Sequence, residues 1–247
     1  MKILSVGNSF SQDAQAYLAP LAAADGVELC CVNLMIGGCS LARHAGNLLN
    51  DNDRYGYEVC GSRKEGVTLR DGVSRERWDI VTLQQYSLHS GLPETYQPYL
   101  DILHDYVRRQ HPNAVIWMHE TWAYEQEDRA YAGEEPVYCD QQDMYARLHQ
   151  TYAEAADRYG IGVIPVGSAV QQARQTLPAF DVTAGGLSLN RDGHHLSWFY
   201  GRYLAAAVWY RTLLERPVTG NPYLPTIDGV TADPVIIRSL QELVDTL

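Results

Sequence analysis

The chain has 247 residues, of which 46% are hydrophobic and 20% charged, so it is long enough to bury a sizeable core and is expected to form a single domain, 1–247. With 30 acidic against 19 basic residues, its net charge of −11 argues against a nucleic-acid or anionic-membrane partner, because phosphate binding needs a concentrated basic face. No stretch approaches the roughly 20 apolar residues of a membrane helix. Lys2 leads at once into a short apolar run rather than a signal peptide, which predicts a cytoplasmic protein.

Five short apolar segments alternate with helical patterns along the chain. Strands are expected at 2–6, 27–34, 79–83, 114–118 and 162–166. The spacing of apolar residues predicts helices at about 14–25, 41–49, 96–107, 137–159, 168–177, 195–215 and 234–247. Strands that alternate with helices form parallel sheets covered on both faces. The chain is therefore predicted to be α/β, a three-layer α/β/α sandwich with a five-stranded parallel sheet.

The stretch at about 54–73 departs from this alternation. Tyr55, Tyr57 and Val59 recur at every second position, as do Val67 and Leu69, and a segment bounded by glycines separates the two runs. This pattern predicts a β-hairpin inserted into the α/β domain. The hairpin could be a lid, a contact of a homo-oligomer or ordinary packing, and the sequence leaves these alternatives open.

Residue types that carry chemistry follow the predicted strands. Open α/β sheets bind ligands beyond the C-terminal ends of their strands, so a site is expected in those loops. Ser9 follows the first strand at the turn into a helix, and Asp192 and His195 share the loop before the helix at 195–215. An aspartate three residues before a histidine can bond one imidazole nitrogen while the other nitrogen faces a serine. The sequence therefore predicts a catalytic triad of Ser9, His195 and Asp192.

Three sequence blocks, in this order, resemble those of the SGNH (GDSL-type) hydrolases and, among them, the DUF4886-like branch. The blocks are Gly7-Asn8-Ser9-Phe10-Ser11, Ile36-Gly37-Gly38-Cys39-Ser40-Leu41 and Asp192-Gly193-His194-His195. The resemblance runs from the first strand to the helix after His195 and implies the flavodoxin-like fold of that superfamily.

The resemblance implies an esterase that works through an acyl-enzyme. His195 would take the proton of Ser9, which attacks the ester carbonyl, and Asp192 would orient His195. The backbone N–H groups of Ser9 and Gly38 would hold the oxyanion together with a side-chain amide. Neither a metal ion nor a cofactor is implied.

The third oxyanion donor departs from the family pattern. The family supplies an asparagine from a G-x-N-D block, and this chain has Gln84-Gln85-Tyr86-Ser87 there. Gln85 could supply an equivalent amide N–H, with Gln84 or Ser87 as alternatives.

Further loop residues are candidates for the substrate pocket: His119, Trp122, Tyr86 and His194. The partner is expected to be a small-molecule ester with a small acyl group such as acetyl. Because aromatic side chains in these loops could stack on a sugar ring, an acylated carbohydrate is one substrate to consider.

Competing interpretations exist for the same residues. Ser9 could serve only as a helix N-cap, since serine is favoured there. A metal-dependent hydrolase could use Asp192, His194, His195 and His119, although no H-E-x-x-H or comparable ligand spacing is present. A non-catalytic ligand-binding member of the fold is a further alternative, motivated by the missing asparagine.

Overall fold

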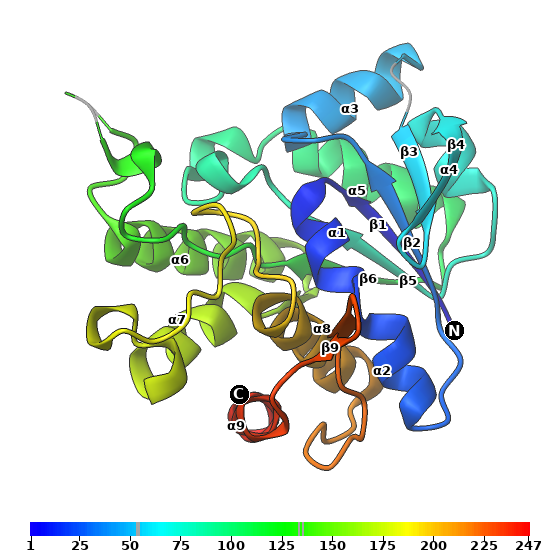
Figure 1. The fold of residues 1–247 in the computed structure, drawn as a ribbon. Helices are drawn as coiled ribbons and strands as arrows, with labels where there is room; N and C mark the ends of the chain where they lie inside the picture. Colours follow the sequence, from blue (N-terminus) through cyan, green and yellow to red (C-terminus); the bar gives the residue numbers. More distant parts are fainter. Residues whose placement is uncertain (53–54, 133, 135) are drawn as a thin grey trace.

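One seven-stranded sheet organises the molecule (Figure 1). The computed structural model describes residues 1–52, 55–132, 134 and 136–247. The strands pair in the order β4-β3-β2-β1-β5-β6-β7. Their bounds are Lys2–Gly7 (β1), Cys30–Met35 (β2), Tyr55–Val59 (β3), Ser62–Val67 (β4), Ile80–Leu83 (β5), Val115–His119 (β6) and Gly162–Ile164 (β7).

The predicted number of five strands is wrong for this sheet, because the inserted hairpin joins it. β2, β1, β5, β6 and β7 run parallel and match the five expected strands to within a few residues. β3 pairs antiparallel with β2, and β4 pairs antiparallel with β3. The hairpin thereby covers the backbone edge that β2 would otherwise expose. Residue 54, where the predicted insertion begins, lies outside the described residues.

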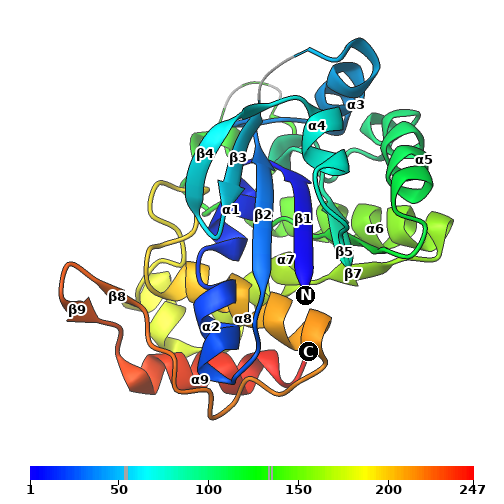
Figure 2. The same cartoon turned by 90° about the vertical axis from the view of Figure 1, so that its right-hand side faces the viewer.

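Helices cover both faces of the sheet and give the predicted three layers (Figure 2). α1, α2, α8 and α9 pack together on one face, α3, α4 and α5 lie on the other, α6 packs on β6 and β7, and α7 contacts α6 and α8. Their bounds are Ser9–Gln15 (α1), Leu18–Ala24 (α2), Leu41–Asn50 (α3), Leu69–Ser74 (α4), Tyr99–Gln110 (α5), Gln141–Tyr159 (α6), Val166–Thr176 (α7), Tyr200–Leu214 (α8) and Pro234–Val244 (α9).

Two helices differ from the expected ones. The helix predicted at about 14–25 is divided into α1 and α2, and the helix predicted from 195 begins only at Tyr200 because the residues before it form a bonded loop. Short elements complete the fold: the two-stranded pair β8 (Thr226–Ile227) and β9 (Val230–Thr231) and five single-turn 3₁₀ helices at Ser87–His89, Pro93–Thr95, Arg129–Tyr131, Pro178–Phe180 and Val182–Ala184.

The order of the parallel strands reverses between β1 and β5. From β1 the chain moves to β2 on one side, and it later crosses to β5 on the other side of β1. In open α/β sheets, ligands bind at such a switch point, beyond the C-terminal strand ends. Ser9 follows β1 at this position.

The apolar residues form a core around the sheet. On the central strand β1, Ile3, Leu4 and Val6 are at most 2% exposed, as expected for a strand covered on both faces. Within the described part of the chain, no helix has the length and apolar character needed to cross a bilayer.

The inserted hairpin is bonded to the first helix as well as to β2. Glu58 on β3 is 5% exposed. Its Oε1 accepts from Gln12 Nε2 on α1 at 2.7 Å, and its Oε2 accepts from Asn33 Nδ2 on β2 at 3.2 Å. Burial raises the pKa of Glu58, and these two hydrogen bonds oppose the rise. The hairpin is thus part of the packed domain.

A buried carboxylate holds α6 and α7 against the end of β6. Glu120, 1% exposed, accepts hydrogen bonds from His149 Nδ1 on α6 and from the Ser168 backbone N–H on α7, both at 2.8 Å. Ser168 Oγ lies 3.1 Å from Glu120 Oε2 and 3.2 Å from His149 Nδ1. The hydrogen bond to Glu120 raises the pKa of His149, while partial burial opposes this.

The raised pKa of His149 predicts a pH-dependent contribution to stability. Such a group stabilises the fold fully below its unfolded pKa, about 6.5, and loses this effect as the pH rises through the higher folded value. We expect His149→Gln to lower the free energy of unfolding by up to about 1 kcal/mol near pH 5.5, because the half-exposed ring is screened by solvent. The loss should be smaller near pH ~9, where the imidazole is neutral in both states. Urea titrations at the two pH values measure both losses, and equal losses would contradict the prediction.

Candidate active site

Ser9 stands at a tight turn from β1 into α1. Asn8, directly before it, has an extended backbone (φ −144°), and its Oδ1 accepts the Phe10 N–H at 2.9 Å. A Cβ atom on Gly7 would lie 2.0 Å from Ser11 Oγ, so only glycine fits at this close approach. Asn8 is therefore the N-cap and Ser9 the first helical residue, which removes the interpretation of Ser9 as the cap.

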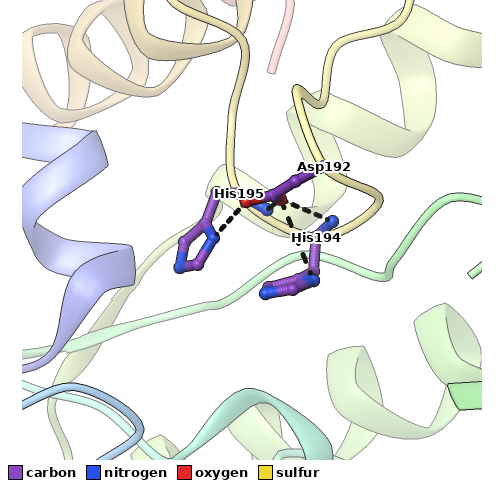
Figure 3. Close-up of side chains that lie close together, drawn as sticks. All are labelled: Asp192, His194 and His195. Atoms are coloured by element: carbon purple, nitrogen blue, oxygen red, sulfur yellow. Dashed lines mark hydrogen bonds and ion pairs between the residues drawn. The ribbon is translucent and has the colours of Figure 1, made fainter.

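His195 lies between Ser9 and Asp192. Its Nε2 is 2.9 Å from Ser9 Oγ, and its Nδ1 is 2.8 Å from Asp192 Oδ2. The backbone N–H of His195 also donates to Asp192 Oδ1 at 2.8 Å, so one short turn holds the carboxylate and the ring together (Figure 3). A carboxylate at Nδ1 favours the tautomer with the proton there, which leaves Nε2 free to accept the Ser9 hydroxyl proton.

Asp192 provides a fixed negative charge behind His195. Its side chain is 45% exposed. Partial burial alone would raise its pKa, but hydrogen bonds from the His195 backbone N–H, the His195 ring and the His194 backbone N–H outweigh this effect and lower the pKa to about 2. The carboxylate is thus ionised across the neutral range and can stabilise an imidazolium on His195.

Two backbone N–H groups at the site are available to a ligand. The N–H of Ser9 is in the first turn of α1, where helical N–H groups have no intrahelical acceptor. Gly38 lies in the turn 36–39, which the Cys39 N–H closes on Ile36 O at 3.2 Å, and its φ of +61° suits glycine. Among the residues that the structure describes, neither N–H donates to a protein acceptor.

A cavity of about 340 Å³ opens at Ser9. It is lined by Asn8, Ser9, Phe10, Gly37, Gly38, Tyr86, Ser87, Tyr124, His194 and His195. Aromatic rings make much of its wall, and the hydroxyls of Ser87 and Tyr124 pair at 2.6 Å. A small cavity with apolar walls and a few polar groups is typical of a small-molecule site. Of the predicted pocket residues, Tyr86 and His194 line it.

A buried chain of side-chain hydrogen bonds joins the loops behind the cavity. Asn8 Nδ2 donates to Cys39 O at 3.2 Å, beside Gly38. Asn8 Oδ1 also accepts from Gln84 Nε2 at 2.8 Å, and Gln84 Oε1 lies 2.9 Å from His119 Nδ1. Asn8, Gln84 and His119 are at most 1% exposed. The ends of β1, β5 and β6 and the loop after β2 are thereby linked one to the next.

The hydrogen bond from Phe10 to Asn8 determines which atom donates and which accepts along this chain of side chains. The Phe10 N–H can only donate, so Asn8 Oδ1 faces it and Gln84 must present its NH₂ to the same oxygen. Gln84 Oε1 then faces His119, whose Nδ1 must carry the proton. Burial lowers the pKa of His119 to about 3, so the ring is neutral, as this tautomer requires.

The expected role of Gln85 as an oxyanion donor is corrected by its position. Its side chain is fully buried, and Nε2 donates to Thr95 O and Thr95 Oγ1, both at 3.0 Å. Its Oε1 accepts the backbone N–H groups of Leu41 and Tyr86. The amide therefore holds two loops together outside the cavity. Gln84 faces Asn8 instead, and only the third candidate, Ser87, lines the cavity.

His119 and Trp122, predicted to line the pocket, lie behind it. Both are fully buried. Trp122 stacks on Phe10 with ring centres 4.1 Å apart, and its Nε1 donates to His194 O at 2.7 Å. It therefore supports the loop that carries His195 from behind. His119 is the last residue of β6 rather than part of the loop after it, whereas Trp122 lies in that loop as expected. The sequence could not show that both side chains turn into the core.

Three of the four residues predicted as possible metal ligands lie close together. In the described part of the chain, Asp192, His194 and His195 bring one donor atom each within 4.8 Å of one another, and His119 is not among them. Both ring nitrogens of His195 already contact Ser9 and Asp192.

The sequence did not predict a role in the site for Asn8 or Phe10. For Asn8 a signal was available, because an asparagine directly before a helix is typical of an N-cap. The other two hydrogen bonds of its side chain involve residues 31 and 76 positions away in the sequence, which no local pattern reveals.

Comparisons with known proteins agree with this architecture. A family model, Domain of unknown function (DUF4886), matches residues 2–236. The chain is similar to the crystal structure of a DUF4886 family protein from Bacteroides uniformis, with 36% identity and a TM-score of 0.86 over 100% of this chain and 93% of that one. The comparison with curated proteins returned no match.

More distant structures share the fold. A candidate SGNH hydrolase from Slackia heliotrinireducens is 22% identical with a TM-score of 0.58, over 86% of this chain and 98% of that one. An acetylxylan esterase from Geobacillus stearothermophilus, solved as a catalytic mutant, is 14% identical with a TM-score of 0.52, over 85% and 92% of the two chains. These likenesses show the SGNH-hydrolase fold.

The buried bonds of Asn8 predict a large effect of its removal. Asn8→Ala strips the acceptor from Phe10 and Gln84 and the donor from Cys39 O, so we expect the free energy of unfolding to fall by about 2–3 kcal/mol. Asn8→Ser should recover about 1 kcal/mol, since serine restores the helix cap without reaching Gln84 or Cys39. Urea unfolding of the three proteins measures both effects. If alanine and serine destabilise equally and by under about 1 kcal/mol, the chain of bonds does not have this role.

Proposed function

Because the chain belongs to the DUF4886 family and has the SGNH-hydrolase fold, we propose that it is a serine hydrolase that cleaves carboxylic esters through an acyl-enzyme. One observation carries the proposal: His195 contacts Ser9 Oγ through Nε2 at 2.9 Å and Asp192 through Nδ1 at 2.8 Å. Nucleophile, base and orienting carboxylate are thus arranged as covalent acyl transfer requires.

Acylation begins with proton transfer to His195. As Ser9 Oγ attacks the ester carbonyl, its proton moves to His195 Nε2, and Asp192 stabilises the resulting imidazolium. The carbonyl oxygen becomes an oxyanion that the N–H groups of Ser9 and Gly38 would hold. The tetrahedral intermediate then collapses, the C–O bond to the alcohol breaks, and His195 returns the proton to the leaving alcohol.

Deacylation repeats these steps with water. His195 takes a proton from the water, whose oxygen attacks the acyl carbon, and the carboxylic acid leaves as Ser9 regains its proton. The Ser87–Tyr124 hydroxyl pair lines the same cavity and is the side-chain candidate for a third oxyanion contact.

A small acyl group fits this site best. The cavity at Ser9 measures about 340 Å³ and has aromatic walls from Phe10, Tyr86 and Tyr124. An acetyl ester would fill a small part of it and leave room for the alcohol. The fold shared with an acetylxylan esterase supports trying acetylated carbohydrates first.

Covalent labelling tests the nucleophile. We expect a fluorophosphonate probe to modify Ser9, and Ser9→Ala to abolish both labelling and hydrolysis of p-nitrophenyl acetate, because the attacking oxygen is lost. Ser168→Ala is the matched control, because Ser168 also lies beside a histidine and a carboxylate. There, however, the serine and the carboxylate of Glu120 contact the same ring nitrogen, His149 Nδ1, so the histidine does not lie between them as it does in a triad. Labelling should persist in that variant. A folded wild-type protein that neither labels nor hydrolyses the ester would refute the proposal.

A metal-dependent hydrolase would respond differently to a fluorophosphonate and to a chelator. This alternative is favoured by the donor atoms of Asp192, His194 and His195 within 4.8 Å. Hydrolysis that resists the fluorophosphonate and is lost on dialysis against a chelator would support it, whereas a serine hydrolase should keep its activity after dialysis.

The proposed role of Asp192 predicts that removing its charge lowers kcat. Asp192→Asn removes the charge that stabilises the imidazolium, and we expect kcat to fall by about 10²–10³, less than for a fully buried triad aspartate because water reaches this carboxylate. Steady-state kinetics on p-nitrophenyl acetate measure the change. Asp128→Asn, near His194 but without contact to His195, is the control and should change kcat by less than about threefold. Equal losses in the two variants would show that Asp192 does not act through His195.

A further inference from the structure

A fully buried carboxylate, Asp13, lies one helical turn after Ser9 on α1. Two guanidinium groups surround it: Arg191 Nη1 lies 3.1 and 3.0 Å from its two oxygens, and Arg202 on α8 donates through Nε at 2.8 Å and lies 2.7 Å away through Nη2. Both guanidinium groups also lie over the ring of Trp198, at 4.3 and 4.1 Å.

Asp13 contacts both ends of the turn that carries the base. Arg191 precedes Asp192, and Leu196 follows His195. The backbone N–H of Leu196 donates to Asp13 Oδ2 at 2.9 Å, and Arg191 Nη1 bonds both Asp13 and Leu196 O. Together with the Arg191 N–H to His195 O bond at 2.9 Å, these contacts close the turn on itself and fasten it to α1.

The loop after β6 also bonds the turn, through Trp122 Nε1 to His194 O and the Glu125 N–H to Gly193 O. Among the described residues, however, the direct hydrogen bonds between the turn and α1 are those of Asp13 and the contact of Ser9 with His195. The turn lies outside the helices and the main sheet, and its regular pairing is the single bridge between Asn190 and Leu196. Ser9 and His195 are 186 residues apart in sequence, and a proton transfer between them requires hydrogen-bond reach. Asp13 sits on the same helix as Ser9, four residues on and therefore on the same side of it.

We propose that Asp13 is a positioning residue that sets the separation between Ser9 and His195. Its carboxylate locks the 191–196 turn to the helix of the nucleophile, and the charges of Arg191 and Arg202 make the carboxylate the fixed centre of that contact. The catalytic consequence rests on the proposed function, whereas the geometric consequence does not.

The experiment compares Asp13→Asn with wild type. Asparagine keeps the size but loses the charge that binds two arginines, so we expect the turn to shift and kcat on p-nitrophenyl acetate to fall about 10²-fold, as misplacement of a catalytic group by about 1 Å can cause. KM should stay within about twofold, since Asp13 does not line the cavity. Asp245→Asn is the matched control. It removes a carboxylate that bonds Val218 and Thr219 and faces Arg211, away from the site, and kcat should not change.

A double-mutant cycle distinguishes positioning from general stability. If Asp13 acts through His195, then Asp13→Asn should change the residual activity of His195→Ala by less than about threefold, because the base it positions is gone. An equal loss of about 10² in both backgrounds would overturn the proposal in favour of a merely structural role, and so would an unchanged kcat in the single variant.

A replacement variant and a crystal structure test the role of Asp13 if the first variant does not fold or wild type is inactive. If Asp13→Asn does not fold, Arg191→Lys takes its place in the cycle. Lysine keeps the charge but lacks the planar guanidinium that lies over the Trp198 ring and thereby places Nη1 between Asp13 and Leu196 O, so we expect a loss of about tenfold. A crystal structure of the variant reports the Ser9 Oγ–His195 Nε2 separation directly. Should wild type hydrolyse no ester, the proposed function fails, and a separation beyond hydrogen-bond reach would still support the role of Asp13; an unchanged 2.9 Å would overturn it.

Discussion

The buried amide of Asn8 determines how the strand ends meet. A parallel sheet brings its C-terminal strand ends to one edge but does not fix the loops beyond them, and each buried polar group in those loops needs a partner. Asn8 satisfies three such groups at once: the N–H of Phe10 in the first turn of α1, the carbonyl of Cys39 and the NH₂ of Gln84. Because a buried unsatisfied group is costly, these bonds favour the observed arrangement, in which Ser9 and Gly38 line the same cavity.

Two polar clusters therefore flank Ser9 on a helix of only seven residues. On one side, Asn8 connects Ser9 to the loop of Gly38 and to the ends of β5 and β6. On the other, Asp13 connects it to the turn of Asp192 and His195. Trp122 supports the same turn from the core through its bond to His194 O. The side chains of His195 and Asp192 are partly open to solvent, whereas Asn8, Asp13 and Trp122 are buried.

Sequence patterns predicted the parts of this arrangement that depend on local order. The five parallel strands follow from apolar runs, and the Ser9, Asp192 and His195 assignment follows from loop position and the three-residue spacing. The pairing of β3 with β2 was not predictable, since alternation identifies a hairpin but not the edge it joins. The side chains of Gln85, His119 and Trp122 were misplaced for a similar reason. A residue at or just after the end of a strand can still turn inward, and each of the three bonds a partner more than 30 residues away in sequence.

The bond between Glu58 and Gln12 bears on how this family can diverge. An insertion at the edge of a sheet is usually free to change in length and sequence without regard to the rest of the domain. Here the inserted hairpin supplies a buried acceptor, Glu58, for the Gln12 side chain on α1 and for Asn33 on β2. Loss of the hairpin would remove the acceptor of Gln12 Nε2 and one of the two acceptors of Asn33 Nδ2. The hairpin and α1 should therefore be inherited as a unit, with changes at Glu58, Gln12 and Asn33 occurring together across related chains.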